Sequence, residues 1–290
     1  MSNGYPTKPV GKRVAVVTDS TSYVPQRLYE SLGVRTVSLY VGWDGDLRPE
    51  CSYCDLPAFY ERLRREPEVP RTSQPSIGDF LDVYRPLVEA GTDVASVHLA
   101  AGLSGTCESA REAAALLAQE GHDARVEVID AETGAGGLGL VVIAAAECAD
   151  GGADLDTVAR CARDTRAGLD IFFYLDTLEF LRRGGRIGAA RAMLGTALQL
   201  KPILTFGTEI APVARVRTRA RGLDRLAEYL RELRARGANR WIVQQIQCEE
   251  PSRRMLEQGR EIFNSEPEFV SEVGPVLGAH LGAGMLVGGF

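Results

Sequence analysis

The amino-acid sequence predicts a two-domain α/β protein. The chain has 290 residues, enough for two domains at ~150 residues each. Stretches typical of buried strands alternate with stretches of helical spacing, until the alternation loosens around Gly151 and Gly152 and the character changes after Ala167. We therefore expect a short flexible lead over residues 1–12, an N-terminal α/β domain with a mostly parallel sheet over 13–167, and a C-terminal α/β domain over 168–290.

Strand and helix patterns follow one another in the N-terminal half. Strands are expected over Val14–Ser22, which ends in a polar loop, and over Val34–Val41, Asp93–Leu99 and Arg125–Ile129. Helices are expected over Val24–Leu32, Leu56–Arg65, from Ile77 onward, and over Ser109–Gln119, Leu140–Ala149 and Leu155–Ala167. Pro86 is expected to kink the third of these helices or to stop it early.

The C-terminal half begins with an aromatic strand over Ile171–Leu175. A short helix then ends at Gly184 and Gly185, because two glycines favour a helix C-terminus. Further helices are expected over Ala189–Leu198, Leu223–Arg236 and Arg253–Phe263, and further strands over Ile203–Phe206, Ile210–Thr218, Trp241–Gln247, Phe269–Val273 and Met285–Val287. The sequence contains no internal repeat.

Composition excludes several classes of protein. Hydrophobic residues make up 45% of the chain and charged residues 25%, which is ordinary for a globular protein with a sizeable core. The net charge of −6 argues against broad nucleic-acid binding, which depends on Lys and Arg. The polar lead has no signal-peptide core, and no run approaches ~18 apolar residues, so we expect a cytoplasmic protein without stable membrane insertion.

The six cysteines do not predict a disulfide scaffold in a chain of this size. Cys51 and Cys54 have the C-x-x-C spacing of redox and zinc sites. No second pair and no nearby histidine accompanies them, so the four-ligand set of a structural zinc is missing. We expect no metal and no cofactor.

The stretch Arg71-Thr72-Ser73-Gln74-Pro75-Ser76 is the first candidate binding site. Ser76 and Asp79 fit a capping box for a helix that starts near Ile77, and Pro75 stiffens the preceding segment. Thr72 and Ser73 would then lie on a stiff loop aimed at the helix N-terminus, a setting that favours anions. An ordinary helix start is the alternative.

A second candidate anion site follows the strand that ends at Leu99. Ser104 or Thr106 would cap the next helix, beside the free backbone N–H groups near Gly105. A third polar group, His280, stands among the glycines of Gly274–Gly284, where backbone can approach a ligand closely.

Enzymatic alternatives stay open at this point. Ser104 and His280 are a nucleophile and a base for a serine hydrolase, although the G-x-S-x-G elbow is absent. The run Gly134–Gly139 matches G-x-G-x-x-G, the fingerprint of a dinucleotide site. Asp154 or Asp156 follows at about the sequence distance expected for the acidic residue that binds the ribose. Four residues separate this run from its strand, however, and close helix packing explains the glycines as well. A cluster of arginines over Arg215–Arg225 is either a solvated face or a docking surface for an acidic partner.

Six features in fixed order resemble the DegV family, which includes the fatty-acid-binding subunit of bacterial fatty acid kinase. They are Thr18-Asp19-Ser20, Thr72-Ser73-Gln74-Pro75-Ser76, Leu103-Ser104-Gly105-Thr106, the Gly-Gly-Arg-Ile element within Leu178–Ile187, Lys201-Pro202-Ile203-Leu204, and Gly274-Pro275 followed by Gly278-Ala279-His280. The match runs from about Val14 to the C-terminus.

The resemblance implies a two-domain DegV-like fold that holds one long-chain fatty acid between its domains. By that resemblance Thr72, Ser104, the amide of Gly105 and His280 would bind the carboxylate, and Arg186 would support the site or dock a partner. A separate ATP-dependent kinase would phosphorylate the bound acid to an acyl phosphate, so this chain would be a carrier and not the catalyst. Ala283 stands where many relatives have proline, which puts the rigidity of this segment in doubt.

Overall fold

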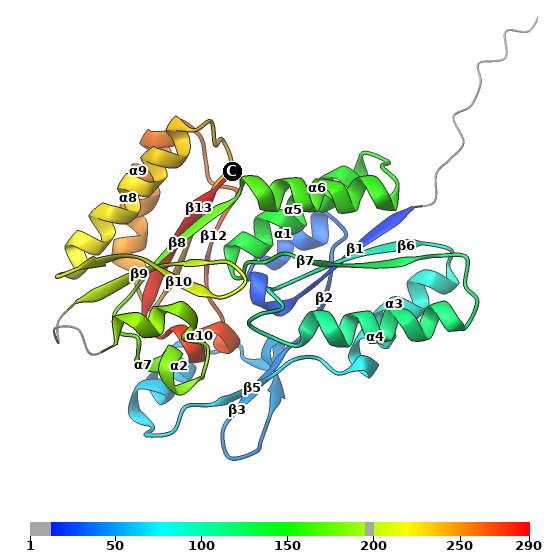
Figure 1. The fold of residues 1–290 in the computed structure, drawn as a ribbon, viewed down its shortest axis with the longest axis horizontal. Coiled ribbons are helices and arrows are strands. Elements are labelled where there is room, and N and C mark those ends of the chain that lie inside the picture. The colour runs from blue at the N-terminus through cyan, green and yellow to red at the C-terminus, as the bar shows by residue number, and fades with distance from the viewer. Residues whose placement is uncertain (1–12, 195–199) are drawn as a thin grey trace, which may run out of the picture.

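The computed structural model describes residues 13–194 and 200–290 (Figure 1). The expected lead over 1–12 and residues 195–198 of the expected helix Ala189–Leu198 lie outside this range. Three sheets organise the described chain, and the pocket described below is lined by residues of the second and third sheets and of the loops that follow strands of the first.

The first sheet is parallel and has the strand order β2-β1-β6-β7. Its strands are β1 (Val14–Asp19), β2 (Arg35–Val37), β6 (Asp93–His98) and β7 (Val126–Asp130). Helices α3 (Ile77–Glu89) and α4 (Thr106–Gln119) lie on one side of it, and α5 (Gly136–Asp150) and α6 (Leu155–Gly168) on the other (Figure 1). The connections through these helices are what parallel strands require.

The second sheet is mixed and has the order β10-β9-β8-β13-β11-β12. Its strands are β8 (Asp170–Leu175), β9 (Lys201–Phe206), β10 (Ile210–Val216), β11 (Trp241–Ile246), β12 (Phe269–Glu272) and β13 (Gly284–Gly289). Only the β11–β12 pair is parallel. Helices α8 (Arg219–Ala235) and α9 (Glu249–Phe263) lie together on one side of it (Figure 1). The α/β class, the two-domain arrangement and the parallel N-terminal sheet are confirmed, whereas the boundary near Gly168 stays a prediction.

A small third sheet and several short helices complete the fold. The sheet has the order β4-β3-β5, with β3 (Tyr40–Gly42), β4 (Arg48–Pro49) and β5 (Arg71–Ser73). The remaining helices are η1 (Ser20–Ser22), α1 (Gln26–Ser31), η2 (Glu50–Ser52), α2 (Leu56–Arg65), α7 (Glu179–Arg183), η3 (Gly188–Met193) and α10 (Pro275–Leu281). Helix α10 packs against α2 and α7.

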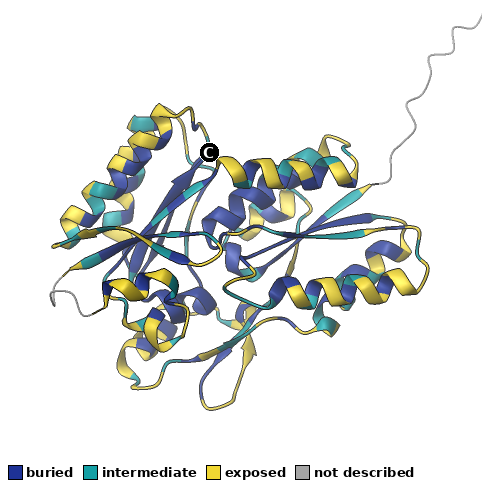
Figure 2. Cartoon of the chain, in the orientation of Figure 1, coloured by how far each residue is buried: buried dark blue, intermediate teal, exposed yellow. Residues whose placement is uncertain are grey.

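Helix α5 joins the two large sheets into one hydrophobic core. Every residue from Gly136 to Ile143 is buried, and the helix packs against β1 and β6 as well as β11 and β13. Its Leu138 and Val142 belong to the same apolar cluster as Val16 of β1 and Phe173 of β8. Figure 2 shows this pattern as buried strands and exposed outer helix faces.

Several segments differ in detail from the sequence expectations. The stretch Val34–Val41 forms two strands in different sheets, β2 and β3, because the chain turns between Val37 and Tyr40. Helix α3 continues through Pro86 to Glu89. The described part of Ala189–Leu198 belongs to the 3₁₀ helix η3. The glycine-rich segment after β12 contains the helix α10, which Pro275 starts and Gly282 ends with a φ of 67°.

Cysteine pairing also differs in part from expectation. Cys148 and Cys161 form a disulfide between α5 and α6, with Cα atoms 6.8 Å apart. One such bond is no scaffold, but the sequence spacing did not reveal it. Cys51 and Cys54 are free and exposed. Within residues 13–194 and 200–290, no group of histidine, cysteine and acidic side chains is arranged to hold a metal ion, and no helix is long and apolar enough to span a membrane.

Candidate ligand-binding pocket

One pocket lies between the second and third sheets and the loops that follow β2 and β6. Its open volume of about 40 Å³ is far below the ~300–1,000 Å³ of small-molecule sites, so a larger ligand enters only if the walls move apart. Its walls are mostly apolar, and a few polar side chains gather among them. The lining residues are Leu39, Thr72, Ser73, Gln74, Leu99, Leu103, Ser104, Arg186, Phe206, Ile210, Val276, Leu277, His280 and Leu281.

Thr72 and His280 meet in this pocket although 208 residues separate them in the chain. The Thr72 Oγ1 and the His280 Nε2 are 2.9 Å apart, a hydrogen-bond distance. Thr72 lies on β5, which pairs with β3, so the expected stiff loop is a short strand. The capping box of Ser76 and Asp79 forms directly after it, as predicted.

His280 is buried near the end of α10, with 9% of its surface exposed. Its Nδ1 has no hydrogen-bond partner in the described structure. Gly184 stands so close that an added Cβ there would lie 2.2 Å from Nδ1. Burial and, to a smaller extent, the positive charge of Arg186 lower the pKa of His280 from 6.5 to about 4, so the imidazole is neutral at pH 7.

Ser104 and Gly105 lie directly before α4. The Ser104 hydroxyl is 2.9 Å from the Thr106 hydroxyl, and the backbone N–H of Thr106 points to Ser104 Oγ at 3.4 Å. Gly105 itself is the N-cap and has no side chain to cap the helix, so the expected capping by Ser104 or Thr106 was wrong. Ser104 lines the pocket, and Gly105 is backed by the Gln74 side chain.

Arg186 lies at the rim of the pocket and is exposed. Its guanidinium donates to the backbone carbonyls of Gly184 at 2.9 Å and Leu103 at 3.5 Å. It therefore bridges the segment after α7 and the segment before α4. The pocket thus brings together Thr72, Ser104 and His280 with Arg186 at its edge, all four of which the sequence had singled out.

Comparison with known proteins identifies the family. The family model "Uncharacterised protein, DegV family" matches residues 13–288. A DegV domain-containing protein of Streptomyces coelicolor is 37% identical over 281 residues, which cover 96% of this chain and 98% of the relative.

The chain belongs to the DegV family.

Two solved structures of DegV proteins share this fold. One is a DegV family protein from Thermus thermophilus whose structure is described as showing fatty acid binding. It is 33% identical to this chain with a TM-score of 0.82, and the match covers 96% of this chain and 99% of the Thermus chain. The other is DegV of Bacillus subtilis, which is described as a fatty acid binding protein. It is 30% identical to this chain with a TM-score of 0.85, and the match covers 97% of this chain and 100% of the Bacillus chain.

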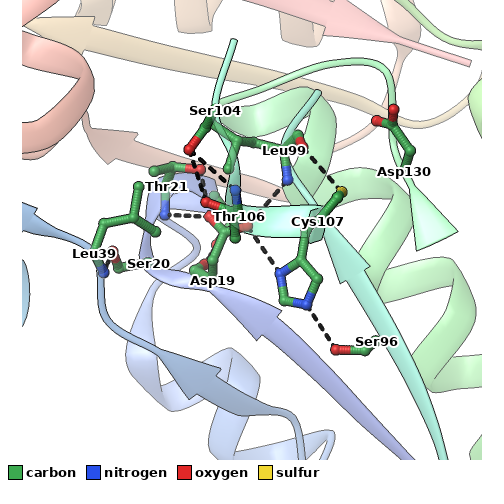
Figure 3. Close-up of polar contacts among 12 residues, drawn as sticks. Asp19, Ser20, Thr21, Leu39, Ser96, Leu99, Ser104, Thr106, Cys107 and Asp130 are labelled. Atoms are coloured by element: carbon green, nitrogen blue, oxygen red, sulfur yellow. Dashed lines mark hydrogen bonds and ion pairs between the residues drawn. The ribbon is translucent and has the colours of Figure 1, made fainter. Parts of the chain in front are cut away.

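In this DegV protein a buried polar network lies behind the pocket, and the sequence analysis gave it no role. Asp19 accepts hydrogen bonds from the backbone N–H groups of Thr21 and Leu99, each at 3.0 Å (Figure 3). His98 Nδ1 is 3.1 Å from the same carboxylate, and His98 Nε2 is 2.6 Å from the Ser96 hydroxyl. The Thr18-Asp19-Ser20 motif was the available signal for this network. All of these side chains are buried, so the network fixes the ends of β1 and β6.

The contacts of Ser104 and His280 do not support the serine hydrolase alternative. The Ser104 hydroxyl is bonded to Thr106, and the His280 Nε2 faces Thr72. A nucleophile needs a base within hydrogen-bond reach, so this geometry does not activate Ser104.

The glycine run Gly134–Gly139 is explained by packing. Gly136, Gly137 and Gly139 lie in the first turns of α5 and are buried. An added Cβ at Gly136 would lie 2.2 Å from Ile242, and one at Gly139 would lie 2.6 Å from Val24. The backbone N–H of Gly136 donates to Gln244 at 2.6 Å, so the helix start faces the second sheet and not a nucleotide.

The arginine cluster is partly neutralised by its own helix. Arg225 forms ion pairs with Glu228 at 2.7 Å and Glu232 at 2.9 Å, and Arg221 lies 3.8 Å from Asp224. Its role as a docking surface stays a prediction.

Proposed function

We propose that this protein binds one long-chain fatty acid in the pocket, with the carboxylate held by Thr72, Ser104, the amide of Gly105 and His280. The observation that carries the proposal is the 2.9 Å contact of Thr72 with His280 among mostly apolar walls. The fatty acid binding of DegV relatives at 33% and 30% identity supports it. Arg186 at the rim adds positive charge near the head group.

The chemistry of the lining suits an amphipathic acid. Each buried methylene is worth ~0.8 kcal/mol, so a dozen supply about 10 kcal/mol before binding costs. A hydrogen bond to a charged group contributes roughly 1.5–3 kcal/mol. The apolar wall therefore supplies affinity, and the polar residues orient the carboxylate. A carboxylate removed from water needs several donors. Thr72 and His280 share one hydrogen bond, so when His280 Nε2–H donates to Thr72 Oγ1, the Thr72 hydroxyl is free to donate to the carboxylate. The Ser104 hydroxyl is free in the same way when Thr106 donates to it, and the Gly105 N–H would add a third donor.

We propose further that the protein acts in the cytoplasm as a carrier that presents the acid to a separate ATP-dependent kinase. The contacts of Ser104 and His280 do not activate Ser104 as a nucleophile, which supports the carrier role. The purified protein with ATP should leave the bound acid unchanged, and acyl phosphate should form only when the kinase is added. Acyl phosphate made by this chain alone would contradict the carrier role.

Alanine substitution of the hydroxyl groups tests the site. Thr72→Ala and Ser104→Ala should each weaken palmitate binding by about tenfold, because each removes a donor to a charged group. The measurement is a fluorescence titration, with mass spectrometry of organic extracts from the freshly purified protein to name the acid. Ser73→Ala is the matched control, since the Ser73 hydroxyl donates to Gln74 O at 3.1 Å. Unchanged affinity in both variants would place the carboxylate elsewhere.

A further inference from the structure

Four apolar residues of the pocket wall have backbone N–H groups that donate to polar side chains behind the wall. The residues are Leu39, Leu99, Val276 and Leu277. Their acceptors are, in the same order, Ser20 Oγ at 3.1 Å, Asp19 Oδ2 at 3.0 Å, Glu50 Oε1 at 2.7 Å and Tyr23 Oη at 3.0 Å. The wall is therefore held from outside by hydrogen bonds as well as by packing.

Three of these four amides depend on one carboxylate. Glu50 Oε1 accepts the Val276 N–H directly and the Tyr23 hydroxyl at 2.8 Å. Glu50 Oε2 accepts the Ser20 hydroxyl at 2.5 Å. The amides of Leu39 and Leu277 therefore reach Glu50 through a single hydroxyl each. Only the Leu99 amide is held independently, by Asp19.

Glu50 itself does not line the pocket. It belongs to η2, is 5% exposed, and faces a separate groove together with Ser20, Tyr23 and Pro275. Gly274 allows the close approach, because a Cβ there would lie 3.0 Å from Glu50 Oε1 and 2.5 Å from the Tyr23 ring. A buried carboxylate with three donors is costly to bring out of water, so its bonds fix the groups that make them.

We propose that Glu50 is the positioning residue of the pocket wall. It holds Leu39 and the first turn of α10, and thereby determines how closely the wall contacts the acyl tail. This inference rests on the proposed fatty acid binding. Glu50 would affect how the wall binds the acyl tail, whereas Thr72 and Ser104 would bind the head group.

The dependence of affinity on chain length separates the two roles. The probes are decanoate, dodecanoate, myristate and palmitate. In the unmodified protein each added methylene should tighten binding about fourfold. Glu50→Ala should reduce this increment to about twofold and weaken palmitate binding at least about tenfold. Thr72→Ala should weaken all four probes by the same factor.

The conservative variant Glu50→Gln should restore the fourfold increment, because an amide oxygen still accepts from Val276 and Tyr23. Glu30→Ala is the matched control: Glu30 lines the same groove, is exposed and bonds only Gln26 at 2.7 Å, so its loss should change nothing. A Glu50→Ala variant that binds all four probes like the unmodified protein overturns the proposal, and so does a Glu50→Gln variant as weak as Glu50→Ala.

Hydrogen exchange measured by NMR tests the wall without a ligand. Glu50→Ala should speed exchange of the Leu39, Val276 and Leu277 amides at least about tenfold, and leave the Leu99 amide unchanged as internal reference. If no probe binds the unmodified protein, the proposed function fails, while the exchange rates still decide whether Glu50 holds the wall. If Glu50→Ala does not fold, Tyr23→Phe replaces it: faster exchange at Leu277 supports the proposal, and unchanged exchange overturns it.

Discussion

At the scale of single residues, the site depends on a histidine that burial keeps neutral. His280 presents Nε2 to Thr72, and its Nδ1 has no partner in the described structure. A neutral ring costs little to bury, whereas an imidazolium in the same place would lack a counter-charge. A fatty acid carboxylate would supply that counter-charge. The head-group site is therefore electrostatically complete only with an anion beside it.

Titration of His280 by NMR tests this interpretation. Without fatty acid the ring should titrate with a pKa of about 4, lowered from 6.5 by burial and by Arg186. Addition of palmitate should raise this pKa, because a nearby negative charge favours the imidazolium. The exposed pair of His122 with Glu120 should not respond to palmitate and serves as the reference. A His280 signal that palmitate leaves unmoved would mean that the carboxylate binds away from α10.

The residues of the pocket were easier to predict than its support. Thr72, Ser104 and His280 stand out as polar groups in their motifs, and Arg186 was named through the resemblance to the DegV family. Glu50 was missed, because its partners are 27 residues and 226 residues away in sequence. Only the turn before η2 and the position of α10 bring these groups together, and neither has a signature in a single sequence.

At the scale of elements, the structural role of glycine was the hardest to predict from the sequence. No helix was expected in the glycine-rich segment after β12, but Gly278 lies within α10, where an added Cβ would be 2.2 Å from the Tyr60 hydroxyl. Helix α5 begins at Gly136, four residues before the predicted start at Leu140. In both cases glycine serves close packing, which a sequence pattern does not distinguish from a turn.

Substitution in the glycine run tests its packing role. Gly136→Ala should lower the free energy of unfolding by about 1–3 kcal/mol, since the new methyl group overlaps Ile242 and Gln244. The measurement is urea unfolding. Gly168→Ala, at the end of α6, is the control: its Cβ would have Phe290 at 4.0 Å as nearest neighbour, so stability should be unchanged or higher. A Gly136→Ala protein of full stability that has lost saturable NAD binding would restore the nucleotide interpretation.

At the scale of the whole molecule, α10 connects the two halves of the chain. Its first turn is bonded to Glu50 and Tyr23 from the N-terminal half, and His280 meets Thr72 of β5. The overall α/β architecture could be predicted because strand and helix periodicity is local. The place where α10 docks could not, because it depends on side chains that meet only in the folded chain.

Two buried groups near opposite ends of α10 make the stability of the protein depend on pH in opposite directions. Burial raises the pKa of Glu50 from 4.5 to about 7, so the folded protein keeps a proton that the unfolded chain releases between these values. Stability from Glu50 therefore falls as pH rises from about 4.5 to 7. The pKa of His280 falls from 6.5 to about 4, so its contribution falls as pH drops through that window. Each effect amounts to about 3 kcal/mol.

Single substitutions should separate these two opposing pH dependences of the free energy of unfolding. In the unmodified protein they offset each other, so the free energy of unfolding should change little between about pH 4.5 and 6.5. Glu50→Gln removes one titration and should leave a protein that loses stability as pH drops from 6.5 toward 4. His280→Gln should instead lose stability as pH rises from 4.5 to 7. Urea unfolding across this range measures both. Parallel curves for the two variants would show that neither group titrates in the folded protein as its burial requires.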